Sequence, residues 1–148
     1  MFTRLKDVFA SFQKNDVRYL VIGGIAAILH GVPRTTFDLD ILIDPVPDNA
    51  RRLLDALAAT GLGTATLISS AELLANEITV FKDRIRIDVQ TSTPGIEFAA
   101  AWERRVVLTF EGQDLNVVSR EDLIASKRAA GRSIDIEDVH LLGPPKTT

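Results

Sequence analysis

The stretch VIGGIAAILHGVPRTTFDLDILID, residues 21–44, decides the fold of this chain. It continues a short apolar run that begins at Tyr19 and stops at two glycines, a pattern typical of a buried strand that ends in a tight turn. Residues 25–31 then predict a short helix that ends at Gly31. In residues 37–44 acidic and apolar residues alternate at first, which predicts a second strand.

The second strand is expected to carry its acidic residues on one face. Successive side chains of a strand point to opposite sides of a sheet, so Asp38, Asp40 and Asp44 share a face. Asp44 stands at the strand end, where capping a turn is an alternative role. Two unpaired carboxylates that point to one place repel each other unless a cation lies between them. Asp38 and Asp40 therefore predict a site for a hard divalent cation, Mg²⁺ or Mn²⁺.

A third carboxylate comes from a later part of the chain. Residues 78–91 predict two strands of a hairpin, and in the second of them Asp88 stands between two apolar residues that would take the buried face. If this strand lies beside residues 37–44, Asp88 completes a cluster of three carboxylates. Such a cluster can hold two metal ions that grip a phosphate during an in-line displacement.

The glycine pair Gly23-Gly24 fits the same kind of site. A strand–glycine–helix turn lets the backbone approach a ligand closely and directs helix N–H groups at it, which suits a polyphosphate. Taken alone, two glycines usually indicate only a turn, and a single D-x-D often indicates solvated carboxylates. In this order along one chain, the two motifs together indicate a metal-dependent phosphate site.

The composition is that of one globular domain. The chain has 148 residues, 46% of them hydrophobic and 25% charged, and a net charge of −3, which does not favour nucleic-acid binding driven by net charge. It has no cysteine and two histidines, which excludes disulfides, thiolate sites and a polyhistidine metal cage. No stretch has the length of a membrane span and the N-terminus does not resemble a signal peptide, so we expect a cytoplasmic protein without a membrane partner. We expect one domain over residues 1–142 and a flexible tail over residues 143–148.

The remaining segments predict an α/β fold, a small mixed β-sheet flanked by helices. A second hairpin is expected over residues 105–119, with its turn near Glu111-Gly112. Ser119 and Asp122 together form a helix-start signal. Helices are expected at residues 3–14, 48–60 with Asp48 as N-cap, part of 69–77, 96–104, 121–132 and 134–142.

Residues 21–44 resemble the signature of the polymerase-β-type nucleotidyltransferase superfamily, in which a glycine turn precedes a D-x-D and a third acidic residue follows on a later strand. The closer similarity is to the small AbiEii-like nucleotidyltransferases, known as toxins of type IV toxin–antitoxin systems. They share the form R-x-T-x-D-x-D, here Arg34 to Asp40. They also share a helical lysine followed by an arginine and two aspartates, which correspond here to Lys127, Arg132, Asp135 and Asp138. The resemblance spans residues 19–142, nearly the whole chain.

This resemblance implies a nucleotidyltransferase fold and a role for each motif residue. The catalytic and metal-binding residues would be Asp38, Asp40 and Asp88, the last of them also a candidate base for the attacking hydroxyl. The nucleotide-binding residues would be Gly23, Gly24, Arg34, Thr36 and Lys127. Arg34 has two open roles, a phosphate contact or an ion pair with a nearby aspartate. Asp135 or Asp138 would support Lys127 or the metal region.

The implied activity is Mg²⁺-dependent transfer of a nucleoside monophosphate from a nucleoside triphosphate (NTP) to a hydroxyl, with release of pyrophosphate. The acceptor would be a protein, an RNA end or a small molecule. The alternative is a catalytically silent module of the same fold that binds or regulates within a toxin–antitoxin-like pair, with an antitoxin-like partner.

Overall fold

The computed structural model describes the backbone of residues 2–143 and the side chains of residues 4–143. The expected flexible tail lies outside the described residues, apart from Gly143. Across the described part of the chain, no helix combines the length and the apolar character that crossing a bilayer requires.

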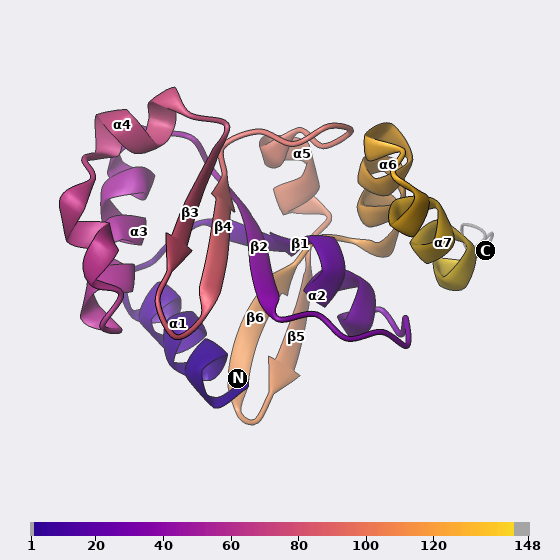
Figure 1. Ribbon diagram of the computed structural model, residues 1–148, viewed down its shortest axis with the longest axis horizontal. Coiled ribbons are helices and arrows are strands. Elements are labelled where there is room, and N and C mark those ends of the chain that lie inside the picture. Colours follow the sequence, from indigo (N-terminus) through magenta and orange to yellow (C-terminus); the bar gives the residue numbers. More distant parts are fainter. Residues whose placement is uncertain (1, 144–148) are drawn as a thin grey trace.

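Six strands form one mixed sheet in the order β3-β4-β2-β1-β6-β5, as Figure 1 shows. The two hairpins and the β1–β2 pair are antiparallel, whereas β2–β4 and β1–β6 are parallel. The predicted mixed sheet and both hairpins are therefore confirmed. The strands are β1 (Tyr19–Ile22), β2 (Asp38–Ile43), β3 (Ile78–Lys82), β4 (Arg86–Gln90), β5 (Val106–Phe110) and β6 (Gln113–Val117).

Helices flank this sheet. In Figure 1, α2 lies in front of the sheet, α3 and α4 stand on the side of β3, and α6 and α7 stand together on the opposite side. The helices are α1 (Phe2–Lys14), α2 (Gly23–Leu29), α3 (Pro47–Ala59), α4 (Ser70–Ala75), α5 (Phe98–Glu103), α6 (Arg120–Ala130) and α7 (Ser133–Leu142), with a 3-10 helix at Gly63–Leu67.

Two helix starts differ from the sequence-based expectation. Helix α2 begins at Gly23, so the glycine pair forms its first turn and does not precede it. Helix α3 has Pro47 in its first turn and Val46 as its N-cap, so Asp48 is not the cap. Proline suits the first helical position because its fixed φ fits the helix and that position needs no N–H. Asp48 still favours the helix, since its charge lies in the first turn.

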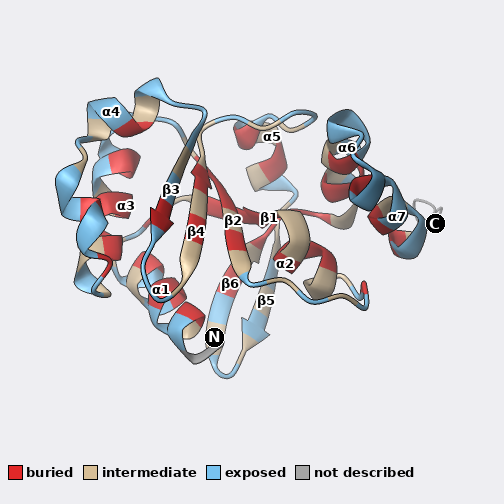
Figure 2. Ribbon diagram, in the orientation of Figure 1, coloured by how far each residue is buried: buried red, intermediate tan, exposed pale blue. Residues whose placement is uncertain are grey.

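The core lies at the centre of the sheet, where Figure 2 shows most of the buried strand residues. All of β1 is buried, and in β2 the residues Leu39, Ile41 and Ile43 are fully buried. Asp38 and Asp40 alternate with them and are only partly buried. The strand thus places its acidic residues on the opposite face, as its alternating pattern predicts.

Candidate active site

The parallel register of β2 and β4 brings acidic residues from two distant parts of the chain together. Asp40 lies directly opposite Asp88, and Asp38 lies directly opposite Arg86. Neighbouring strands are about 4.8 Å apart and opposed side chains share a face. Asp88 therefore lies on the same face of the sheet as Asp38 and Asp40, beside them.

A pocket of about 340 Å³ opens over these side chains, and we name it the carboxylate cleft. Of the residues predicted for the site, five line it: Gly23, Asp38, Asp40, Asp88 and Lys127. Gly24, Arg34 and Thr36 are not among its lining residues. Among the other lining residues, three are charged and were not predicted as ligands, namely Arg86, Arg132 and Asp135.

The Asp40 carboxyl lies in an environment that disfavours its charge. Burial is the main cause of a rise in its pKa. The charge of Asp88, a hydrogen bond between the Asp40 and Asp88 carboxyl groups, and the charge of Asp38 add to this rise. The nearby charge of Arg132 opposes these effects, and together they raise the pKa of Asp40 to about 7. Asp40 therefore changes charge near neutral pH, where an ordinary aspartate is fully ionised.

The glycine motif packs against the D-x-D motif. Gly23 has a φ of +68°, and a Cβ there would overlap the Asp40 carboxyl, with the Cβ and Cγ of Asp40 only 3.1 Å away. A Cβ at Gly24 would lie 3.3 Å from the side chain of Thr36. The two glycines thus leave room for one side chain of β2, that of Asp40, and for one of the segment before it, that of Thr36. The glycine motif and the D-x-D motif are therefore in direct contact in the folded chain.

Arg86 lies among the three carboxylates. Its Nε donates a hydrogen bond to Oδ1 of Asp88 at 2.9 Å, and its Nη2 donates one to Oδ2 of Asp88 at 3.3 Å. The same Nε lies 3.9 Å from Oδ2 of Asp38. Within the described residues, no three acidic or histidine side chains form a ready ligand set for a metal ion. Both oxygens of Asp88 are already engaged by Arg86 in this structure.

The donor chemistry of the carboxylate cleft nevertheless fits a divalent cation. Three carboxylates are the hard oxygen ligands that Mg²⁺ and Mn²⁺ take. Burial is the main cause of the raised pKa of Asp40, and the like charges of Asp88 and Asp38 add to it; a cation between the carboxylates would relieve this second contribution. Asp38, Asp40 and Asp88 are therefore the residues that could hold such an ion.

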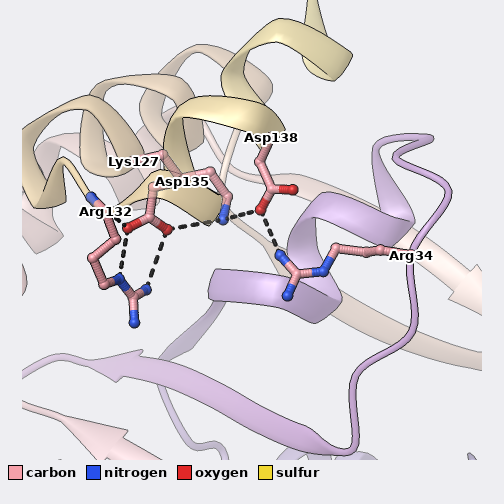
Figure 3. A network of polar contacts seen from close by, with 5 residues as sticks. All are labelled: Arg34, Lys127, Arg132, Asp135 and Asp138. Atoms are coloured by element: carbon pink, nitrogen blue, oxygen red, sulfur yellow. Dashed lines mark hydrogen bonds and ion pairs between the residues drawn. The ribbon is translucent and has the colours of Figure 1, made fainter.

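A buried ionic network joins α6 and α7 beside the carboxylate cleft (Figure 3). Nζ of Lys127 donates to Oδ2 of Asp138 at 2.7 Å and lies 3.6 Å from Oδ1 of Asp135. All three side chains are at most 5% exposed. Nη1 of Arg34 also donates to Oδ2 of Asp138, at 2.6 Å. Of the two roles considered for Arg34, the structure thus contains the ion pair.

Arg132 completes this network on the side of the cleft. Its Nε donates to Oδ2 of Asp135 at 2.6 Å, while 74% of its side chain remains exposed. Burial acts to raise the pKa of Asp135, but the hydrogen bond and charge of Arg132, with the charge of Lys127, hold that pKa below its usual value. Of the three cations that line the cleft, Arg132 is the most exposed, since 74% of its side chain is accessible against 42% for Arg86 and 5% for Lys127.

Comparison with known proteins places the chain in a family. The model of a family described as nucleotidyltransferase of unknown function (DUF6036) matches residues 3–142, and the chain belongs to that family. No curated protein matches the chain closely enough to count as a relative. The superfamily expected from the sequence is thereby supported, whereas the closer similarity to AbiEii-like proteins stays a prediction.

Two solved structures share the fold. One is an antigenic nucleotidyltransferase-like protein from Paracoccidioides brasiliensis, with a TM-score of 0.60 at 17% identity over 95% of this chain and 73% of the other. The second is a putative nucleotidyltransferase from Thermotoga maritima, with a TM-score of 0.59 at 14% identity over 92% of this chain and 88% of the other. At these identities the similarity establishes the nucleotidyltransferase fold alone, as the sequence predicts.

Proposed function

We propose that this protein transfers a nucleoside monophosphate from an NTP to a hydroxyl acceptor, with Mg²⁺ or Mn²⁺ as cofactor. One observation carries the proposal: the β2–β4 register places Asp88 beside Asp40, with Asp38 on the same face of the sheet. Three adjoining carboxylates are costly to a fold unless a cation offsets their charge, and hard oxygen ligands select a hard divalent ion. Membership of a nucleotidyltransferase family supports the same chemistry.

Asp38, Asp40 and Asp88 would hold the cation. When bound, the cation neutralises the charge that develops on the triphosphate and on the attacking oxygen. Asp40 would give up its proton to become a ligand, and its pKa of about 7 makes this feasible at neutral pH. Asp88 is the candidate base for the acceptor hydroxyl. The remaining catalytic effect is the orientation of the two substrates.

The triphosphate would lie along Gly23 and Arg132. Gly23 lines the cleft with backbone atoms alone, since the Asp40 carboxyl fills the space beside its Cα, and the exposed guanidinium of Arg132 supplies positive charge at the cleft. Lys127 lines the cleft and remains a proposed phosphate contact, although its Nζ is already paired. Gly24, Thr36 and Arg34 would act indirectly. Gly24 and Thr36 pack against each other before β2. Arg34 connects the segment between α2 and β2 to α7, through its contact with Asp138.

A transfer assay tests this proposal. The full chain is incubated with Mg²⁺, each of the four α-labelled NTPs, and a cell extract that supplies RNA, protein and small-molecule hydroxyls. Label should appear on an acceptor, and Asp40→Asn should reduce it by at least about a hundred-fold, the scale of losing a residue essential to charge stabilisation. Asp55→Asn, an exposed carboxylate on α3, is the matched control and should keep full activity. Equal transfer by the Asp40 variant would refute the assignment.

A second candidate function is the catalytically silent module of a toxin–antitoxin-like pair. The specific observation in its favour is that Arg86 engages both oxygens of Asp88, so the carboxylates already have a counter-charge. This candidate expects no labelled acceptor with any NTP, together with a stable complex with an antitoxin-like partner. The cytoplasm is the proposed location of both candidates, and for the transferase it is also where NTPs and Mg²⁺ are available.

A further inference from the structure

Arg86 occupies a particular place in the carboxylate cleft. It is the first residue of β4, two positions before Asp88, and it lies opposite Asp38 across the β2–β4 pair. Alternation along β4 therefore places its side chain on the same face as all three carboxylates. The guanidinium spans two of them, with hydrogen bonds of 2.9 and 3.3 Å to Asp88 and a distance of 3.9 Å to Asp38.

The oxygens that Arg86 holds are the ones a divalent cation needs. A two-point hydrogen bond from a guanidinium engages both carboxylate oxygens. A metal ion bound by Asp88 would use at least one of the same oxygens and would repel the guanidinium charge. Arg86 and the cation therefore cannot both hold Asp88 in this way.

Arg86 also has room to leave. Its side chain is 42% exposed, and the only carboxylates it contacts among the described residues are Asp38 and Asp88. It lines a second hollow of about 330 Å³ next to the carboxylate cleft, where the cations Arg4, Lys82 and Arg84 are accompanied by the carboxylates Asp38 and Asp83 as possible partners. A rotation of the long side chain towards this hollow would free Asp88 without a change in the backbone.

We propose that Arg86 is a positioning residue that replaces the divalent cation in the cation-free protein and competes with it for Asp88 and Asp38. The guanidinium keeps the carboxylates oriented and partly neutralised until the ion displaces it. This proposal rests on the proposed function only in its premise that the carboxylates bind a divalent cation.

The test measures Mn²⁺ binding to the full chain, by electron paramagnetic resonance of free Mn²⁺, and thermal unfolding with and without Mn²⁺. Arg86→Gln removes the competing charge, so its Kd for Mn²⁺ should fall about ten-fold relative to the unaltered protein. In the absence of divalent ions the same variant should have a lower Tm, because the carboxylates lose their counter-charge, and saturating Mn²⁺ should abolish the difference. Arg86→Lys, which keeps the charge but not the two-point hydrogen bond, should have an intermediate Kd.

Arg104 provides a matched control outside the cleft. It makes the same two-point contact with Asp122, at 2.9 and 3.0 Å, and its partner is buried to a similar degree. Arg104→Gln should lower the Tm with and without Mn²⁺ and leave the Kd for Mn²⁺ unchanged. This control thus distinguishes the effect of losing an arginine–aspartate pair from the effect of removing a competitor of the cation.

The outcomes distinguish this inference from the proposed function. An unchanged or higher Kd for Mn²⁺ in Arg86→Gln overturns the inference, because the guanidinium would then be neutral or helpful to binding. Absence of Mn²⁺ binding in every variant overturns it as well, together with the metal requirement of the proposed function. A ten-fold tighter Kd without any nucleotidyl transfer supports the inference and refutes the proposed activity.

Discussion

Gly23 and Asp40 are fitted to each other at the atomic level. The backbone of Gly23 has a φ of +68°, which side chains disfavour, and its bare Cα leaves the space that the Asp40 carboxyl fills. Gly23→Ala should therefore add a steric overlap to the backbone strain and reduce the free energy of unfolding by about 3 kcal/mol. Urea unfolding followed by circular dichroism measures this loss.

A substitution at Gly61 separates the backbone strain from the steric overlap. Its φ is +86°, and a Cβ there would meet nothing within 4 Å. Gly61→Ala should therefore cost only the backbone strain, about 1 kcal/mol. If both variants lost the same free energy, Asp40 would be free to move and the close fit between the two motifs would have no structural importance.

The raised pKa of Asp40 makes stability depend on pH. Its pKa is about 7 in the folded protein and about 3.9 in an unfolded chain, so between these values the folded state binds more protons. The free energy of unfolding should therefore fall as the pH rises from about 4 to about 7, without divalent ions present. Asp40→Asn removes this dependence and should be more stable than the unaltered protein by about 2–4 kcal/mol at pH 8, but not at pH 4.

Thermal unfolding across this pH range, in the presence of a chelator, provides the measurement. Asp55→Asn, at an exposed site on α3, should follow the profile of the unaltered protein throughout. A difference between Asp40→Asn and the unaltered protein that stays constant with pH would mean that Asp40 is ionised throughout.

Sequence patterns identify such residues but not their partners. The spacing of Asp38 and Asp40 places both on one face of a strand, and this expectation agrees with the structure. The position of Arg86 two residues before Asp88 was visible in the same alternating pattern. Its contact with Asp88 and Asp38 depends on which strands are neighbours, and alternation within one strand contains no information about that.

At the scale of elements, a buried ionic network holds α7 against α6. Asp138 is only 3% exposed and is shared by Lys127 and Arg34. Asp138→Ala would leave the buried Lys127 with only the more distant carboxylate of Asp135, at 3.6 Å. Because removal of one partner from a buried pair leaves an uncompensated charge, the variant should lose about 3–5 kcal/mol in the free energy of unfolding.

An exposed pair on α3 supplies the comparison for this network. Arg51 and Asp55 lie 3.7 Å apart, and both side chains are more than 60% exposed. Asp55→Ala should cost less than about 1 kcal/mol, as exposed pairs do in water. Chemical denaturation of both variants gives the two values, and a small loss for Asp138→Ala would show that α7 can separate from α6 without unfolding of the sheet.

Helix starts were predicted less well than the helices themselves. The sequence places a helix near residue 48 because Asp48 suits an N-cap, but Pro47 is already in the first turn. Ser119 did cap α6 as expected, since its Oγ accepts a hydrogen bond from the N–H of Asp122. A residue that suits a cap competes with one that suits the first turn, and the local pattern does not decide between them.

At the scale of the molecule, the carboxylate cleft exists because non-neighbouring parts of the chain meet. Residues from β1, α2, β2, β3, β4, α6 and α7 line it, and they span Ile22 to Asp135. Hydrophobic periodicity predicts these elements one by one, and the family resemblance suggests which of them meet. The strand order β4-β2-β1 and the parallel β2–β4 register are properties of the whole sheet, and only the structure supplies them.

A cation that binds the folded cleft must stabilise the whole molecule. The carboxylates come from separate strands, so the site does not exist in the unfolded chain and binding adds to the free energy of unfolding. Mn²⁺ at a hundred times its Kd should add about 2.7 kcal/mol, measurable as a rise in Tm. At one fixed Mn²⁺ concentration the rise should be larger at pH 8 than at pH 6, because Asp40 must lose its proton to bind the ion and its pKa is about 7, which weakens the Kd at pH 6. Asp88→Asn should abolish the rise and Asp55→Asn should retain it. A rise that persisted in Asp88→Asn would place the ion elsewhere on the protein.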